Sequence, residues 1–85
     1  MSWEIRVPKR VKKSIKLFPK EDHGRILQAL HEFSFDPWHG DIEKIGGKEN
    51  LWRKRIGNYR IFYSPQISSK VVEVKEIRRR TSNTY

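Results

Sequence analysis

Hydrophobic and polar residues alternate at the start of the chain. Trp3, Ile5 and Val7 occupy every second position, with polar residues between them. A spacing of two is typical of a strand with one buried face, so we expect a strand at about residues 2–7. Pro8 should end this strand, because proline lacks the N–H group that a continuing strand donates.

Two amphipathic segments follow and meet at Pro19. Between Lys9 and Phe18 the hydrophobic positions take the spacing of a short helix: Val11, Ile15 and Phe18. Pro19 interrupts this helix and begins a second one, predicted at about Lys20 to Phe33, in which Gly24 costs about 1 kcal/mol of helix propensity. The second helix gathers four hydrophobic residues on one face: Ile26, Leu27, Leu30 and Phe33. We expect the two helices to form an antiparallel hairpin that covers a sheet.

Residues 34–50 have no regular periodicity. Turn signals recur along them, at Asp36-Pro37, Gly40-Asp41 and Gly46-Gly47. We therefore expect a loop with room for one short strand, anchored by Ile42 and Ile45.

Residues 51–63, with the sequence LWRKRIGNYRIFY, predict a β-hairpin. Gly57-Asn58 supplies its turn, because both residue types tolerate positive φ. Before the turn, Arg53 and Arg55 alternate with apolar positions and should project away from the core, whereas Lys54 falls in the apolar phase and is an anomaly. After the turn, one face carries Tyr59, Ile61 and Tyr63 and the other carries Arg60 and Phe62.

A turn at Pro65 to Ser69 leads to a last strand, Val71 to Ile77, whose alternation breaks at Glu76. The expected order of elements is therefore β-α-α-β-β-β. This order predicts an α+β fold, a compact single domain of residues 1–85 in which a helical hairpin packs on one face of an antiparallel sheet.

The charge balance points to a polyanion as partner. The 85 residues include 19 Lys and Arg but only 10 Asp and Glu, a formal net charge of +9. Self-repulsion of this size favours an acidic partner, and nucleic acid is the first to consider. The absence of cysteine excludes a disulfide scaffold and a thiolate zinc site, and it fits a reducing cytosol. The chain has no apolar run of about 18 residues and no apolar signal-peptide core at its start, so we expect no membrane contact and a cytoplasmic location.

The excess cations gather in the hairpin and in the final segment, RRRTSNTY. Arginine binds phosphate through two parallel hydrogen bonds, and a phenol such as Tyr85 can accept a proton when it is ionised. His23 and His31 lack a third ligand for a metal, and Gly46-Gly47-Lys48 lacks the spacing of a phosphate-binding loop. We therefore expect neither a metal nor a cofactor, and we assign the histidines no catalytic role.

The ordered set of elements, with DPWHGDIEKI before the hairpin, LWRKRIGNYRIFY and the arginine-rich end, resembles the RelE/ParE superfamily of type II toxins. The resemblance covers nearly the whole chain and implies the RelE-like microbial RNase fold with a cognate antitoxin as partner. In the RelE branch it also implies metal-independent cleavage of messenger RNA in the ribosomal A site. Matched position by position, it gives catalytic roles to Arg53, Arg55, Arg60, Arg79 and Tyr85.

In the reaction that this resemblance implies, the ribose 2′-hydroxyl attacks the adjacent phosphorus. Arg60 would hold the phosphate and Arg79 would neutralise the leaving 5′-oxygen, or the two roles would be exchanged. Tyr85 would take the proton of the 2′-hydroxyl. Ionising a phenol at pH 7 costs roughly 4 kcal/mol, so nearby cations must lower the pKa of Tyr85.

A second group is assigned to nucleic-acid binding: Lys9, Lys12, Lys13, Lys16, Lys54, Phe62, Arg78 and Arg80. Simpler interpretations exist for parts of both groups. The helix lysines could be a solvated helix face, and Arg53 and Arg55 could be charges on an edge strand that prevent aggregation. Phe62 is the aromatic residue in phase with Arg60 and could stack a base.

Two other functions remain open at this point. The ParE branch of the superfamily inhibits DNA gyrase without cutting RNA, and a non-catalytic RNA-binding module would bind RNA and leave it intact. Arg60, Arg79 and Tyr85 favour the RelE branch. In that branch we expect the antitoxin to use an acidic or amphipathic segment that wraps the basic sheet or displaces the C-terminal tail.

Overall fold

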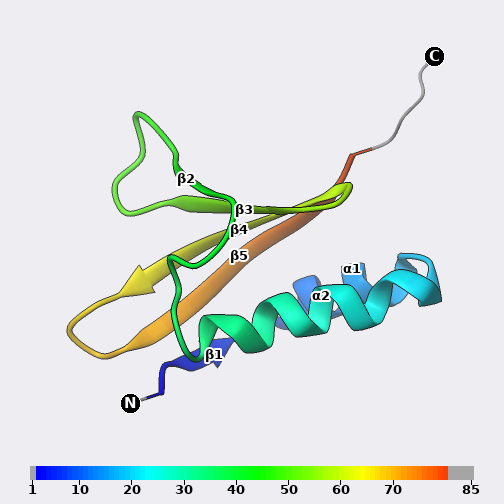
Figure 1. Cartoon of the computed structure of the whole chain (residues 1–85), viewed down its shortest axis with the longest axis horizontal. Helices are drawn as coiled ribbons and strands as arrows, with labels where there is room; N and C mark the ends of the chain where they lie inside the picture. The colour runs from blue at the N-terminus through cyan, green and yellow to red at the C-terminus, as the bar shows by residue number, and fades with distance from the viewer. Residues whose placement is uncertain (1, 81–85) are drawn as a thin grey trace.

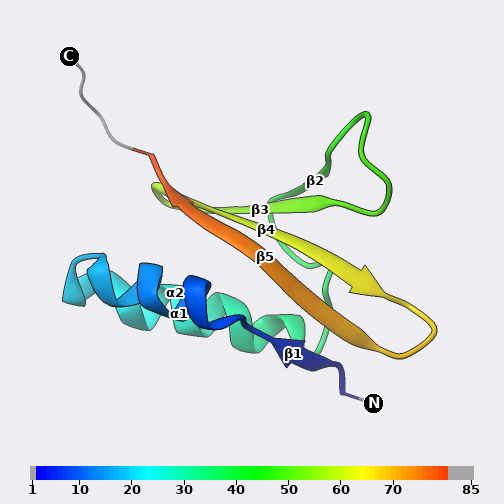
Figure 2. The ribbon, with the colours of Figure 1, turned by 180° about the vertical axis from the view of Figure 1, so that it is seen from behind.

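Five strands and two helices make up the part of the chain that the structure, a computed structural model, describes, residues 2–80. Their order and bounds are β1 (Glu4–Arg6), α1 (Lys9–Leu17), α2 (Lys20–Phe33), β2 (Ile42–Lys44), β3 (Trp52–Ile56), β4 (Tyr59–Gln66) and β5 (Val71–Arg79). Both helices lie on one side of the strands (Figures 1 and 2). The predicted α+β class, with a helical hairpin on one face of a sheet, is confirmed.

The sheet has the strand order β1-β5-β4-β3-β2. β2, β3, β4 and β5 pair in antiparallel fashion, but β1 pairs parallel to β5, so the sheet is mixed and not wholly antiparallel as expected. A parallel pair needs a long crossover connection, and here the chain passes through both helices and three strands between β1 and β5. The short strand allowed for in residues 34–50 is β2, at the opposite edge of the sheet.

Helix α1 is positioned by its first proline and by two buried side chains. Pro8 lies at the N-cap, and its carbonyl accepts hydrogen bonds from the N–H groups of residues 11 and 12, both at 3.0 Å. Val11 and Ile15 are buried against the sheet, while Phe18 caps the C-terminus and packs its ring 4.9 Å from that of Tyr59. The predicted stripe is therefore confirmed.

Helix α2 buries a slightly different face from the one predicted. Ile26, Leu30 and Phe33 are buried as expected, but Leu27 is 56% exposed and Ala29 is buried in its place. Residues 26, 30 and 33 define the centre of the stripe, and the 100° rotation per residue carries residue 27 to its solvent side. No helix within residues 2–80 is long and apolar enough to cross a membrane.

The loop between α2 and β2 is held by aromatic contacts more than by the isoleucines. Pro37 is fully buried, and its carbonyl accepts a hydrogen bond of 2.5 Å from the Tyr63 hydroxyl. The Trp38 ring meets those of Trp3 and Trp52 edge to face, at centroid distances of 5.5 and 6.5 Å. These contacts fix where the chain enters β2. The predicted anchors Ile42 and Ile45 are only half-buried.

The predicted hairpin is confirmed as β3 and β4, which turn at Gly57-Asn58. Gly57 has a φ of +54°, a conformation that favours glycine. Tyr59, Ile61 and Tyr63 are buried under the helices, at 2%, 0% and 0% exposure. Arg60 and Phe62 alternate with them and therefore lie on the other face of the sheet, which we call the outer face.

Strand β5 contains a β-bulge that accounts for its irregular pattern. Its register with β4 shifts between Phe62 and Tyr63, which pair with Glu76 and Val74, so that Lys75 has no partner on β4. The extra residue lets Lys75 and Glu76 both be exposed, while Val74 and Ile77 on either side are buried. The alternation that breaks at Glu76 in the sequence is this bulge.

Candidate nucleic-acid interface

Three arginines lie side by side across the outer face of the sheet. Arg55 on β3 is paired in register with Arg60 on β4, and Arg60 is paired with Arg78 on β5. We call these residues the arginine row. Neighbouring strands are about 4.8 Å apart, so the row brings three positive charges to one short band of surface. Like charges directly opposite each other destabilise a sheet, which favours an anionic ligand at this position.

An aromatic ring lies beside the arginine row. Phe62 is paired with Arg53 on one side and with Glu76 on the other, in the next outward-facing row of the sheet. The guanidinium carbon of Arg78 lies 5.4 Å from the centroid of the Phe62 ring. Phe62 itself is half-buried. A ring next to several cations is the arrangement that stacks a base while the phosphate is held.

Carboxylates neutralise most of these arginines. The ion pairs are Arg53 with Glu43 at 2.5 Å, Arg55 with Asp41 at 2.8 Å and Arg78 with Glu76 at 2.7 Å. In each pair the acid is at least half exposed, so solvent screens the pair and a phosphate can displace the acid at little cost. These acids were not predicted from the sequence. The alternation of Asp41 and Glu43 before the hairpin was an available signal for two of them.

Arg60 differs from its neighbours in the row. No carboxylate within residues 2–80 forms an ion pair with it, and its buried Nε has no hydrogen-bond partner there. A buried guanidinium N–H without an acceptor costs free energy, and an anion that supplied the acceptor would recover it. Arg60 is therefore the residue of the arginine row best suited to bind phosphate.

Arg79 does not join this cluster. It is paired in register with Tyr59, whose side chain is buried under the helices. By alternation Arg79 is in the phase of the helix-covered face, opposite the phase of Arg78. The structure therefore brings Arg53, Arg55 and Arg60 together with Arg78, and not with Arg79.

Lys54 cannot contact nucleic acid as predicted, because it is 3% exposed. Its ammonium group lies 2.8 Å from Glu32 Oε1 on α2 and 5.3 Å from the centroid of the Phe33 ring. The hydrogen bond from Lys54 lowers the pKa of Glu32 below its usual value. Lys54 is a structural residue whose charge is neutralised inside the fold.

The remaining predicted binding residues lie apart from the arginine row. The four exposed lysines of α1 are Lys9, Lys12, Lys13 and Lys16. They belong to the helical layer, on the other side of the sheet (Figure 1). Arg80 follows β5 and donates its backbone N–H to the Asn58 carbonyl at 2.5 Å. The lysines therefore form a second basic surface.

The chain has three tyrosines, and two of them are committed to the core. Tyr59 donates a 2.5 Å hydrogen bond to Asp22 on α2, and its burial raises the pKa of its phenol. Burial raises the pKa of Tyr63 still further, and its hydroxyl donates to the Pro37 carbonyl. Neither phenol can serve as a base on the outer face. Tyr85 lies outside the described residues, so its predicted role stays a prediction.

Histidines and acidic residues form no metal site within residues 2–80, where no group of three or more potential ligands is found. One ring nitrogen of His23 lies 2.8 Å from the Phe18 carbonyl, and His31 packs edge to face on Phe35. These contacts give both histidines structural roles.

No protein-family model matches this chain. Among curated proteins, a Methanocaldococcus jannaschii protein named RelE1, provisionally described as a toxin, is 24% identical over 83 residues, covering 94% of this chain and 92% of that protein.

Solved structures of RelE proteins resemble the fold closely. A chain of the archaeal RelE–RelB complex from Pyrococcus horikoshii is 26% identical, with a TM-score of 0.83, and the match covers 98% of this chain and 100% of that one. The RelB–RelE complex from Methanococcus jannaschii gives 26% identity and a TM-score of 0.70 over 91% and 89% of the two chains. The isolated Escherichia coli RelE toxin, at 15% identity and a TM-score of 0.79 over 96% and 88%, supports the fold alone.

Proposed function

We propose that this chain, a RelE-like toxin of a toxin–antitoxin system, cuts messenger RNA on the ribosome. One observation carries the proposal. The arginine row lies beside Phe62, and its central residue, Arg60, has no acidic partner within residues 2–80. Three cations and an aromatic ring on one open face suit a single-stranded RNA, whose phosphate and base need these two kinds of contact. Such a function requires the cytoplasm, where messenger RNA is translated.

The reaction would begin with attack of the ribose 2′-hydroxyl on the adjacent phosphorus. The new oxygen–phosphorus bond forms as the bond to the 5′-oxygen breaks, and extra negative charge develops on the phosphoryl oxygens. Arg60 is suited to hold this charge, because a guanidinium donates two parallel hydrogen bonds and stays protonated. Arg78 would neutralise the leaving 5′-oxygen. We prefer it to Arg79 because only Arg78 shares the row.

The proton of the 2′-hydroxyl needs an acceptor. Tyr85 is the remaining candidate among the tyrosines, because Tyr59 and Tyr63 are buried and hydrogen-bonded elsewhere. Ionisation of a free phenol at pH 7 costs roughly 4 kcal/mol, so Tyr85 would act only beside cations such as Arg53 and Arg55. Its position would follow from binding of the substrate and the ribosome.

A cognate antitoxin is the expected partner. Solved relatives from P. horikoshii and M. jannaschii are RelE–RelB complexes. On this chain, with its net charge of +9, an acidic antitoxin segment could replace Asp41, Glu43 and Glu76 as partner of the outer-face arginines. Occupation of the arginine row by such a segment would exclude RNA.

The test is a reconstituted translation reaction in which messenger RNA ends are mapped by primer extension, with and without ribosomes. We expect cuts only when ribosomes are present. Arg60→Ala should reduce the cleavage rate about 100-fold or more and leave much of the ribosome affinity intact. Arg78→Ala should lose more activity than Arg79→Ala. Lys44→Ala, which removes an exposed cation on β2, is the matched control and should cut normally.

Each alternative has its own outcome. Cleavage that survives in Tyr85→Phe would remove the tyrosine from the mechanism. If Arg60→Ala lost ribosome binding and its effect on translation to the same extent, a non-catalytic RNA-binding module would be favoured. Intact RNA under all conditions would reject the nuclease, and a gyrase supercoiling assay would then test the ParE-like alternative.

A further inference from the structure

We propose that Lys75 holds a second phosphate of the RNA strand that the arginine row binds. The ligand class rests on the proposed function, but the site itself is separate from the residues assigned above. Two hollows, of about 310 and 370 Å³, share Lys75 as a wall, one beside the start of α1 and the other beside the loop before β3. Four cations and two carboxylates line them together: Arg6, Arg10, Lys48 and Lys75, with Glu49 and Glu73.

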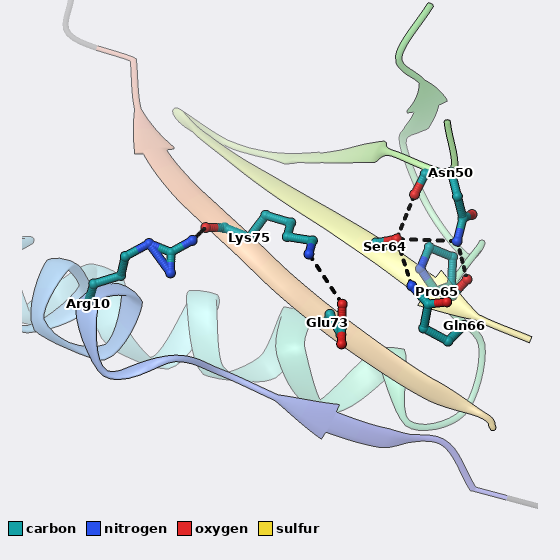
Figure 3. Close-up of polar contacts among 7 residues, drawn as sticks. All are labelled: Arg10, Asn50, Ser64, Pro65, Gln66, Glu73 and Lys75. Atoms are coloured by element: carbon teal, nitrogen blue, oxygen red, sulfur yellow. Dashed lines mark hydrogen bonds and ion pairs between the residues drawn. The ribbon is translucent and has the colours of Figure 1, made fainter. Parts of the chain in front are cut away.

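The bulge in β5 gives Lys75 its position. Because the register with β4 shifts there, Lys75 and Glu76 are consecutive exposed residues between the buried Val74 and Ile77. Bulges often redirect a side chain next to a functional site. Figure 3 shows Lys75 on β5 between Arg10, which reaches it from α1, and the polar residues of β4 and the preceding loop.

Charge around Lys75 is only partly neutralised. Lys75 pairs with Glu73 at 3.2 Å, and both side chains are partly exposed, so this pair contributes about 0–1 kcal/mol. Arg10 donates a 2.7 Å hydrogen bond to the Lys75 carbonyl and not to a carboxylate, so it keeps its full charge at the edge of the hollow. A phosphate could therefore displace Glu73 and bind between the two cations.

Neutral polar groups shape the other hollow. The Ser64 hydroxyl donates to the Asn50 carbonyl at 2.7 Å, and the Asn50 side-chain amide donates to the Pro65 carbonyl at 2.8 Å (Figure 3). This network ties the loop before β3 to β4 and fixes the wall opposite Lys75. A preformed wall lowers the entropic cost of binding.

The distance from the arginine row fits one continuous strand of RNA. Lys75 precedes Arg78 by three residues on β5, or roughly 10 Å at about 3.3 Å per residue. A single strand whose phosphate lies on Arg60 can extend along the outer face past Phe62 and reach Lys75 with a neighbouring phosphate. Basic grooves that follow the backbone in this way are typical of proteins that bind single strands.

Binding of a fluorescent single-stranded RNA of about 12 nucleotides, measured by anisotropy, tests the inference. One phosphate contact changes the slope of log affinity against log salt by about 0.7. Lys75→Ala should therefore lower the slope by about 0.7. The ratio of wild-type affinity to variant affinity should then be about fivefold larger at 0.1 M salt than at 1 M salt. Lys75→Arg should restore both values, and Lys44→Ala should change neither.

Circular dichroism melts check that each variant is folded. A Lys75→Ala protein that is folded and has the affinity and slope of Lys44→Ala would overturn the inference. If binding of polyglutamate depended on Lys75 and binding of RNA did not, an acidic polypeptide would be the ligand and the proposal would also fall. If RNA binding depends on Lys75 but no RNA is cut on ribosomes, the site is supported and the proposed nuclease is rejected. If RNA is cut on ribosomes but RNA binding does not depend on Lys75, the nuclease is supported and the site is rejected.

Discussion

At the scale of single residues, Lys54 is the clearest case of a charge that the fold itself neutralises. Its side chain is only 3% exposed, because it occupies an inward position of β3 beside the Phe33 ring. Glu32 approaches from α2 with an oxygen 2.8 Å from the ammonium group and remains 36% exposed to solvent. The pair therefore joins a helix to the sheet, and its acid lies where the pH of the solvent can affect it.

We expect Glu32→Gln to destabilise the protein by about 1–2 kcal/mol at pH 7, because it leaves the buried ammonium group of Lys54 without a counter-charge. This expected loss of stability is smaller than that for a fully buried pair, because solvent screens Glu32. Urea denaturation measures the change. Glu43→Gln, which breaks the exposed pair with Arg53, is the control and should change stability by less than about 1 kcal/mol.

The same substitution should alter the pH dependence of stability. The hydrogen bond from Lys54 lowers the pKa of Glu32 in the folded protein, so the unfolded chain binds the proton more readily. The contribution is fully present above the ordinary carboxyl pKa of about 4.3 and is lost as pH falls through the lower folded value. Glu32→Gln should lose less stability than the wild type between about pH 5 and 3. Parallel curves would contradict this assignment.

At the scale of elements, two glycines in different settings should respond to alanine with opposite signs. Gly57 has a φ of +54° in the β3–β4 turn, so Gly57→Ala should destabilise by about 1–2 kcal/mol. A new Cβ there would lie 2.6 Å from Arg25 Nη1, but this is the end of a flexible side chain that can move. Gly24 lies within α2, and a Cβ there would have no atom within 4 Å beyond its chain neighbours and the backbone of its own helix. Gly24→Ala should stabilise by about 0.5–1 kcal/mol.

Urea denaturation midpoints measure both glycine variants under the same conditions. Arg25→Ala, combined with Gly57→Ala, separates backbone strain from the contact, because only the contact is relieved when Arg25 is removed. Changes of the same sign at Gly24 and Gly57 would contradict the backbone explanation.

Local periodicity predicted the elements well because it follows from burial alone. The alternation in LWRKRIGNYRIFY indicated the hairpin and the outward phase of Arg60, and the helical spacing indicated both helices. The parallel pairing of β1 with β5 could not be predicted this way, because it depends on contacts between distant segments. The bulge at Lys75 was visible only as a break in alternation. Its position on the outer face required the register of two strands.

The candidate site was predicted in part for the same reason. Arg53, Arg55 and Arg60 alternate with buried positions, and the structure brings them together. Arg79 was taken from the family resemblance, although its spacing of two from the buried Ile77 already indicated the helix-covered face. Lys54 was assigned to binding by its charge, although its phase was apolar. In both cases the pattern of burial was the better guide.

At the scale of the whole molecule, the charge of +9 leaves the fold under self-repulsion that anions can relieve. Chloride acts mainly by screening, whereas an anion that binds the folded protein adds the free energy of binding. The arginine row exists before any ligand arrives, with the Arg60 Nε buried and without a partner among residues 2–80. Inorganic phosphate should therefore stabilise the protein more than chloride does at equal ionic strength.

Phosphate at ten times its dissociation constant should add about 1.4 kcal/mol of stability by linkage. Thermal melts in phosphate and in chloride, matched for ionic strength, measure the difference between the two salts. Phosphate also favours compact states by its exclusion from protein surfaces, so the difference in wild type alone does not identify a site. Arg60→Ala separates the two effects, because exclusion acts on the whole surface and is unchanged by one substitution. The advantage of phosphate should shrink in Arg60→Ala and persist in Lys44→Ala. An equal advantage in all three proteins would mean that the arginine row has no particular affinity for phosphate.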